Sequence, residues 1–139
     1  MNLTWSHAVI YVQDENIMLD FYTNVLGFQI TDRGPLSDGA PDIIFLSQNP
    51  TEHHQLAMVP IRQNTSASNS VNHFAFRLVE FTDLRRLHDR LHDTDGIDIS
   101  PVSHGNTLSL YFNDPEGNGL EVFWDCLLYT SDAADDLGR

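Results

Sequence analysis

The sequence carries the same order of secondary-structure signals twice, and this internal repeat limits the fold more than any other feature. Each half opens with a histidine and a short β-branched or aromatic run, continues with an amphipathic helix, and ends with three strand-like segments. One such βαβββ half cannot cover both faces of its own sheet. We therefore predict an α+β protein in which two βαβββ modules form a curved mixed sheet around a cup, with the helices outside. The alternative is a sandwich with a solid core and no cavity.

The repeat also sets the expected boundaries. A chain of 139 residues suits a single domain. We place this domain at residues 1–125, with modules at about 4–60 and 71–125. Residues 61–70 are polar and lack periodicity, as expected of a linker. Residues 126–139 continue neither pattern, so we expect a disordered or non-native tail without a functional role.

Capping and turn residues mark the ends of the expected elements. Asp14 is the predicted N-cap of the first helix, Gly27 follows that helix, and Thr82 or Asp83 is the predicted cap of the second. Residues 34–39 are rich in turn formers and separate two strands. The predicted strands are His7–Val12, Phe28–Asp32, Asp42–Ser47 and His54–Pro60 in the first module, and His73–Val79, Ile97–Ser100, Thr107–Asn113 and Leu120–Trp124 in the second.

Composition excludes several classes of function. The chain holds 20 acidic residues against seven arginines and no lysine, a net charge of −13, which argues against nucleic acid and anionic membranes as partners. No apolar run is long enough to span a bilayer, and the first twenty residues lack the pattern of a secretion signal. The single Cys126 cannot form an intramolecular disulfide. We therefore expect a soluble, cytoplasmic protein.

Polar side chains alternate with apolar ones along four of the predicted strands. Because successive side chains of a strand point to opposite faces, each of these strands has one apolar face suited to packing under a helix. The opposite faces carry His7, Tyr11, His73, Arg77, Ser109, Tyr111 and Glu121. If these faces line the cup, two histidines and one carboxylate converge in it.

His7, His73 and Glu121 would then form a 2-His-1-carboxylate set, the arrangement that leaves open positions on non-haem Fe(II). Such a centre can lower the pKa of a bound hydroxyl group. Their spacing matches no local ligand motif, and the prediction depends on the equivalent places of the two histidines in the repeat. The alternative is that each histidine is a hydrogen-bonded structural residue of a half-buried strand.

Several segments of the chain resemble the vicinal oxygen chelate superfamily, which includes glyoxalases, bleomycin-binding proteins and extradiol ring-cleaving dioxygenases. His7–Val12 followed by Phe21–Phe28 is typical of the whole superfamily. More discriminating is Leu110–Glu121, which, with His104-Gly105 and His53–Ala57, is similar to the extradiol dioxygenase branch. The resemblance covers about residues 4–125.

This resemblance implies a metal-dependent dioxygenase that cleaves a catechol-type aromatic diol with O₂. It assigns the ligands of Fe(II), or of Mn(II) as in some relatives, to His7, His73 and Glu121. His54 matches a histidine that handles protons near the substrate and oxygen, Tyr111 a tyrosine that hydrogen-bonds a substrate hydroxyl, and His104 another pocket histidine. The expected partners are a small aromatic diol, O₂ and further copies of the chain in a homodimer or larger homo-oligomer.

Two departures keep other functions open. Family members that cleave catechols often carry two pairs of modules, whereas this chain has one. His54 shares strand parity with buried positions, so Gln55 can be the inward residue instead, which is the pattern of a glyoxalase-like lyase or isomerase using Ni or Zn. A metal-free drug-binding protein of the bleomycin resistance kind is a third interpretation. We expect His53 to point away from His54, and His88 and His92 to lie on a solvated helix face.

Overall fold

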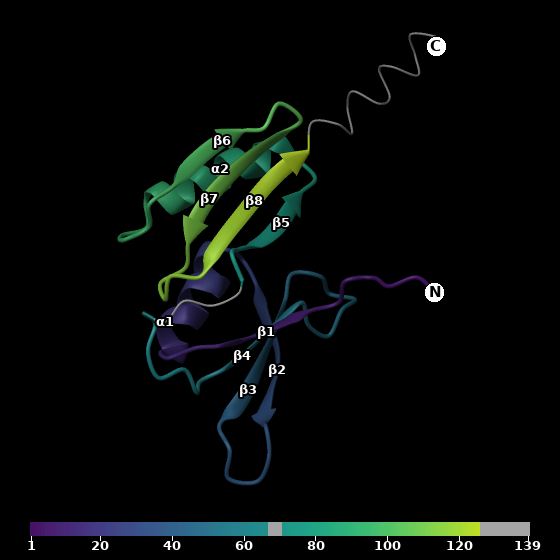
Figure 1. Ribbon diagram of the computed structural model, residues 1–139, viewed down its shortest axis with the longest axis vertical. Coiled ribbons are helices and arrows are strands. Elements are labelled where there is room, and N and C mark those ends of the chain that lie inside the picture. Colours follow the sequence, from purple (N-terminus) through teal and green to yellow (C-terminus); the bar gives the residue numbers. More distant parts are fainter. Residues whose placement is uncertain (67–70, 126–139) are drawn as a thin grey trace. The chain divides into compact units, whose positions relative to one another are not determined.

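The computed structural model describes residues 1–66 and 71–125, in two compact units that divide between residues 68 and 69 (Figure 1). Each unit has the order strand, helix, strand, strand, strand, and each has its own four-stranded sheet. The α+β class and the two βαβββ modules are therefore confirmed. The predicted tail at 126–139 and residues 67–70 of the predicted linker lie outside the described residues.

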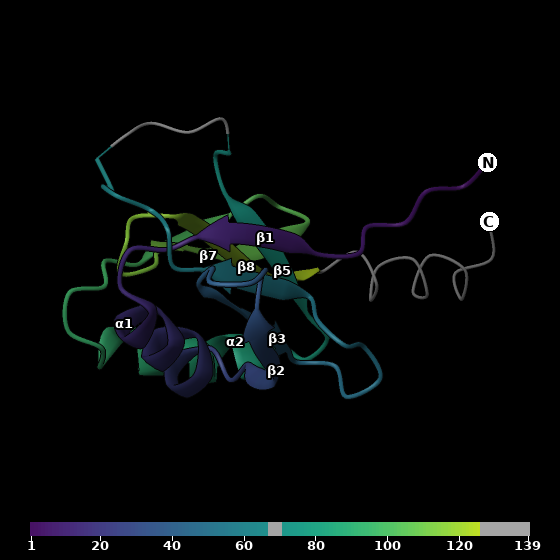
Figure 2. The ribbon, with the colours of Figure 1, turned by 90° about the horizontal axis from the view of Figure 1, so that it is seen from below.

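The first unit contains a mixed sheet with strand order β1-β4-β3-β2. Its elements are β1 (Ala8–Tyr11), α1 (Glu15–Asp20), the π-helical turn η1 (Phe21–Val25), β2 (Gln29–Pro35), β3 (Asp42–Ser47) and β4 (Leu56–Val59). β1 runs parallel to β4, whereas the other neighbours are antiparallel. Residues before β1 form an extended arm, and β1 leads at its other end into α1 (Figure 2).

The helix of the first unit begins as predicted. The Asp14 carboxylate accepts hydrogen bonds from the backbone N–H groups of Asn16 and Ile17, which satisfies two donors that the first turn leaves free. Gly27 follows the helix with a φ of +84°, the left-handed conformation that favours glycine there. Met18, Phe21, Tyr22 and Val25 form the buried apolar side of α1 and η1, as expected of an amphipathic helix, whereas Ile17 is 53% exposed.

The predicted turn at residues 34–39 is partly wrong. β2 continues through Gly34 and Pro35, which pair with Ile43 and Asp42 of β3. β2 is an edge strand, so a proline without a backbone N–H costs no hydrogen bond to a further strand. The chain therefore turns only after Pro35.

The second unit repeats the topology of the first, with strand order β5-β8-β7-β6. Its elements are β5 (Phe74–Leu78), α2 (Phe81–His92), β6 (Ser100–Ser103), β7 (Thr107–Asn113) and β8 (Gly119–Asp125). The parallel pair β5–β8 corresponds to β1–β4 of the first unit. This equivalence, strand by strand, matches the repeat in the sequence.

Two boundaries of the second unit differ from the prediction. The N-cap of α2 is Glu80 rather than Thr82 or Asp83, and in the described part of the chain its side chain makes no capping hydrogen bond. β6 begins at Ser100 rather than at Ile97, because the N–H of Ile97 still bonds back to the carbonyl of Thr94 behind the helix.

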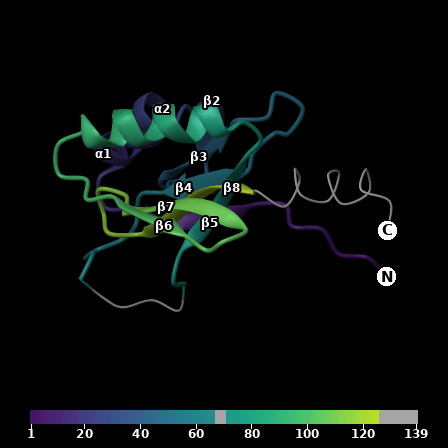
Figure 3. The same ribbon diagram turned by 90° about the horizontal axis from the view of Figure 1, so that it is seen from above.

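Helix α2 lies on one side of the four-stranded sheet of the second unit (Figure 3). Its buried residues Leu84 and Leu91 face the apolar side of that sheet. Leu110, Phe112 and Val122 are buried there as well. The opposite side of the sheet carries the polar positions that strand alternation predicts. Within residues 1–66 and 71–125, no helix has the length and apolar character needed to cross a membrane.

Candidate metal centre and pocket

His73 and Glu121 form an acid–histidine pair in the second unit. His73 directly precedes β5, and Glu121 lies on the neighbouring parallel strand β8, opposite Ala75. The distance from His73 Nε2 to Glu121 Oε2 is 3.2 Å. Two ligand atoms at right angles, each about 2.1 Å from a divalent ion, are about 3 Å apart. The pair therefore already has the separation of two neighbouring metal ligands.

Adjacent polar groups orient both members of this pair. His73 Nδ1 lies 2.6 Å from the side-chain oxygen of Asn72. This contact fixes the imidazole ring with its Nε2 atom directed at Glu121, as neighbouring polar groups do for histidines that bind metal through Nε2. The Ser109 hydroxyl donates to Glu121 Oε1 at 2.6 Å. The Oε2 atom is thereby held on the side of His73.

The charge of Glu121 is stabilised where it lies. Burial disfavours the carboxylate, but hydrogen bonds from Ser109 and Tyr111, together with the nearby His73, outweigh burial and lower the pKa of Glu121. Burial and the neighbouring carboxylate raise the pKa of Tyr111. At neutral pH the site therefore combines an ionised carboxylate with a protonated phenol.

Tyr111 and His104, both predicted from the resemblance, also meet in this unit. The Tyr111 hydroxyl lies 3.0 Å from His104 Nε2, and His104 is exposed in the turn between β6 and β7. The rings of His73 and Tyr111 meet edge to face with centroids 5.8 Å apart. Four of the six predicted site residues are therefore connected within one unit.

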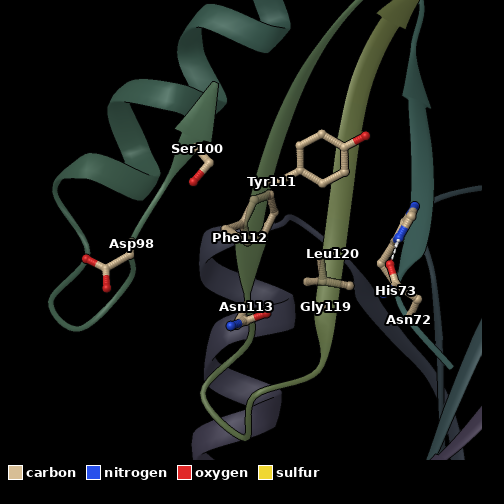
Figure 4. A pocket seen from close by; sticks show the side chains of 9 residues that line it. All are labelled: Asn72, His73, Asp98, Ser100, Tyr111, Phe112, Asn113, Gly119 and Leu120. Carbon is tan, nitrogen blue, oxygen red and sulfur yellow. Dashed lines mark hydrogen bonds between the residues drawn. The ribbon is translucent and has the colours of Figure 1, made fainter. Parts of the chain in front are cut away.

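A pocket of about 320 Å³ opens beside this group (Figure 4). Tyr111 reaches across β8 toward His73 on one side of it, and Asp98 and Ser100 lie on the other side of β7. The complete lining is Asn72, His73, Asp98, Ser100, Tyr111, Phe112, Asn113, Gly119 and Leu120. The sequence prediction missed Asp98 and Ser100. Knowledge of the strand register would have identified Ser100, because Ser100 of β6 is the cross-strand partner of Tyr111 in β7.

Gly119 makes this arrangement possible through a close backbone approach. A Cβ atom on Gly119 would lie 2.5 Å from the Asn72 carbonyl oxygen and 3.2 Å from His73 Cβ. No other described glycine would bring a Cβ within 4 Å of a neighbouring atom. Gly119 thus allows the start of β8 to pack against His73 and against Asn72, which orients the His73 ring.

In the first unit His7 lies against His54, with ring centroids 4.2 Å apart. β4 begins only at Leu56, so His54 lies before the regular strand and strand parity does not bury it. His7 Nδ1 is 2.8 Å from the Ser6 hydroxyl. Burial, and then the neighbouring His7 and His53, lower the pKa of His54. His54 is therefore neutral at neutral pH.

The side chain of Gln55 is engaged elsewhere. Its Oε1 atom accepts a hydrogen bond from the backbone N–H of Gln48 at 2.9 Å, which ties the start of β4 to the end of β3. Of the two candidates for the inward residue, His54 is the one whose ring contacts His7.

His53 does not point away from His54, as its place in the sequence suggested. Its Nδ1 atom lies 2.8 Å from Nδ1 of His54. The expectation is wrong because residues 53–55 precede β4 and do not follow strand alternation. By contrast, His92 is exposed on α2 beside Asp93, as expected. His88 is half-buried beside Asp89 and lines a pocket with Leu84 of α2 and Leu110 of β7, so the expectation of a solvated face fails for His88.

Within either unit, over residues 1–66 and 71–125, no three histidine, cysteine or carboxylate side chains gather into a metal site. The second unit supplies two of the predicted ligands, His73 and Glu121, and the first unit carries His7. The donor set suits a divalent transition metal, because each histidine has a polar neighbour at Nδ1 and the carboxylate is ionised.

The chain belongs to the Glyoxalase/Bleomycin resistance protein/Dioxygenase superfamily, whose family model matches residues 4–122. The resemblance to the vicinal oxygen chelate superfamily is thus confirmed. Metapyrocatechase of Pseudomonas sp. (strain CF600) is 32% identical over 122 residues, which cover 86% of this chain and 38% of that protein. Catechol-2,3-dioxygenase of Bacillus subtilis (strain 168) is 32% identical over 124 residues, covering 86% and 40%. The chain therefore spans about two-fifths of the length of these relatives.

The fold is also found among solved structures. The glyoxylase/bleomycin resistance protein/dioxygenase domain from Frankia sp. EAN1pec aligns with a TM-score of 0.73 at 20% identity, over 90% of this chain and 99% of that one. At this identity the likeness supports the fold alone.

Proposed function

We propose that this chain is a metal-dependent dioxygenase that cleaves a catechol-type aromatic diol beside its two hydroxyl groups. In this reaction one carbon–carbon bond of the ring breaks, and both atoms of O₂ enter the ring-opened product. The observation that carries the proposal is the oriented His73–Glu121 pair at a pocket that Tyr111 also lines. The catechol dioxygenases among the relatives support it.

His7 would complete the ligand set of the metal. Like His73, it directly precedes the first strand of its module, and the residue before it supplies a polar group next to Nδ1. Bound Fe(II), or Mn(II), would supply chelation of both diol oxygens, a lower pKa for a bound hydroxyl and electron transfer to O₂.

The remaining residues would bind the diol and move its proton. Tyr111 keeps its proton, because its pKa is raised, and would donate this hydrogen bond to a diol oxygen in place of Glu121. His104 holds the Tyr111 hydroxyl in place. His54 is neutral, because its pKa is lowered, so it can accept a proton from a diol hydroxyl as a general base.

Size and charge suit a small neutral aromatic diol. The pocket of about 320 Å³ is at the small end of ligand sites, as expected for a single substituted ring. A chain with a net charge of −13 does not repel a neutral catechol, which can lose a proton once it is bound.

The proposal is tested by anaerobic reconstitution with Fe(II), followed by catechol or 2,3-dihydroxybiphenyl in air-saturated buffer. We expect the visible absorbance of a ring-opened product and consumption of one O₂ per diol. His73→Ala should abolish both signals, whereas His92→Ala, at an exposed position of α2, should keep both. Metal-loaded protein that opens none of several catechols would refute the proposal.

A metal-dependent lyase or isomerase with Gln55 as a fourth ligand is the second candidate. Gln55 adjoins Leu56, the strand partner of Ala8, and so lies next to His7 along β1 and β4. Turnover with Ni or Zn that consumes no O₂ and is lost in Gln55→Ala would decide for this candidate. Protein that binds none of these metals would instead favour the drug-binding function.

A further inference from the structure

Asp32, His53 and His54 form a hydrogen-bonded row in the first unit. His53 Nε2 lies 3.2 Å from Asp32 Oδ2, and His53 Nδ1 lies 2.8 Å from His54 Nδ1. Phe45 packs against both imidazoles, with ring centroids 4.9 Å from His53 and 4.8 Å from His54. The row ends at His7, whose ring contacts His54.

A β-bulge brings Asp32 to this row. Ile30 pairs with Leu46, but Asp32 pairs with Phe45, so Thr31 is an extra residue in β2. In regular pairing Thr31 would stand opposite Phe45 and Asp32 would point to the other face of the sheet. The Thr31 hydroxyl also donates to the backbone carbonyl of His53, which ties the bulge to the segment before β4.

The donors and acceptors in the row allow one assignment for neutral imidazoles. A carboxylate only accepts, so Nε2 of His53 must carry a proton. Neutral His53 then has its lone pair on Nδ1, which can accept only from a protonated Nδ1 of His54. His54 is left with its lone pair on Nε2, the ring nitrogen outside the row.

We propose that Asp32 and His53 are positioning residues, which hold His54 in the Nδ1–H tautomer so that its Nε2 atom is a ready proton acceptor. The role as proton acceptor rests on the proposed function. The tautomer itself does not, because it follows from the contacts within the first unit.

The charges around the row favour this arrangement. The backbone N–H of Arg33 donates to Asp32 at 2.8 Å, and this bond, followed by that from His53, lowers the pKa of Asp32 and keeps it an acceptor. The Arg33 guanidinium is bound to Asp42 at 2.8 Å and to Glu15 at 2.9 Å, so it does not compete for Asp32.

The tautomer can be read directly from imidazole ¹⁵N shifts in long-range ¹H–¹⁵N spectra of the 139-residue chain without metal at neutral pH. We expect His54 to show a protonated Nδ1 and an unprotonated Nε2. Asp32→Asn and His53→Phe should lower the population of this tautomer several-fold. His53→Gln should preserve it, because its amide donates to Asp32 and accepts from His54.

Asp38→Asn, a carboxylate change in the loop after β2, is the matched control and should leave the spectrum of His54 unchanged. A protonated Nε2 on His54 in the unaltered protein would overturn the inference, as would an unchanged tautomer in both Asp32→Asn and His53→Phe.

Kinetics separates this inference from the proposed function. If the chain cleaves catechols, His53→Phe should lower kcat by about tenfold to a hundredfold, the usual cost of losing an orienting partner, with metal content unchanged. His53→Gln should recover most of that loss. The expected tautomer in a protein without ring-cleaving activity would refute only the proposed function.

Discussion

The two units have the same topology but different polar side chains at equivalent positions. In the second unit the histidine before the first strand pairs with a carboxylate two strand positions along the neighbouring strand. In the first unit the equivalent histidine, His7, lies beside His54 and the row that ends at Asp32. The same scaffold thus presents an ionised carboxylate beside a histidine in one copy and a neutral imidazole in the other, for which we propose metal binding and proton transfer, respectively.

The largest expected effect separates these two roles. Glu121→Ala should remove most of the bound metal, because it deletes the ionised ligand and leaves His73 without its partner. Activity should fall with metal content, as measured by elemental analysis and O₂ uptake. Asp83→Ala, on the exposed side of α2, is the control. Full metal stoichiometry in Glu121→Ala would show that the second unit does not hold the ion.

His54→Ala should leave metal content unchanged and lower kcat about 10²- to 10⁴-fold, the usual contribution of a general acid–base residue. The reason is that His54 is not one of the proposed metal ligands. Its ring contacts His7, and its Nδ1 atom is bonded to His53 in the hydrogen-bonded row. Metal analysis and steady-state kinetics on the same preparation test this. Loss of metal in His54→Ala would erase the contrast between the two units.

Gly119→Ala should act on both fold and site. Its Cβ would lie 2.5 Å from the Asn72 carbonyl, so the start of β5 must shift, at a cost of about 1–3 kcal/mol in unfolding free energy. Metal affinity should fall because His73 moves with it. Gly34→Ala is the matched control in the first unit, since nothing lies within 4 Å of its Cβ position. Equal behaviour of the two variants in denaturant titrations would contradict the close approach.

The helices offer a smaller test of the same comparison. α1 has a capping carboxylate, and α2 in the described structure has none. Asp14→Ala should therefore lower the unfolding free energy by about 1 kcal/mol. Glu80→Ala should change it by much less. Thermal unfolding of both variants measures the difference, and a larger loss in Glu80→Ala would reverse the assignment of the caps.

The smallest effect concerns acid stability. The pKa of Glu121 is lowered in the folded protein, so the unfolded chain binds this proton first as the pH falls. Glu121 thus contributes stability above the ordinary pKa of a glutamate, about 4.3, and loses it as the pH falls through the folded pKa. The stability difference between the unaltered protein and Glu121→Gln should shrink from pH 6 to pH 3. Denaturant titrations of metal-free samples measure this contribution of Glu121 to the unfolding free energy. A difference between the two proteins that stays constant with pH would contradict the prediction.

Local patterns predicted the elements whose own residues specify them. Thr107–Asn113 is a strand at the predicted bounds, because its side chains alternate between an apolar and a polar face. Asp14 caps its helix as predicted, because capping needs only the next few residues. Where no side chain caps the helix, as at Glu80, the sequence held no signal and the predicted start was two or three residues late.

Strand alternation also identified His73, Glu121 and Tyr111 as sharing one face, and the structure brings them together. It failed for Ser100 and His53. Ser100 was predicted as the last residue of a strand, but it is the first residue of β6 and the cross-strand partner of Tyr111 in β7. His53 meets His54 because neither residue belongs to a strand.

The amino-acid pattern alone was enough to specify two βαβββ modules and the polar face of each sheet, because periodicity and capping act between residues close in the chain. Which side chains contact one another depends on the tertiary structure. The bulge at Thr31, the register of β6 and the approach of Gly119 to Asn72 depend on a partner strand. Pairing between strands is a long-range interaction, and no local preference encodes it.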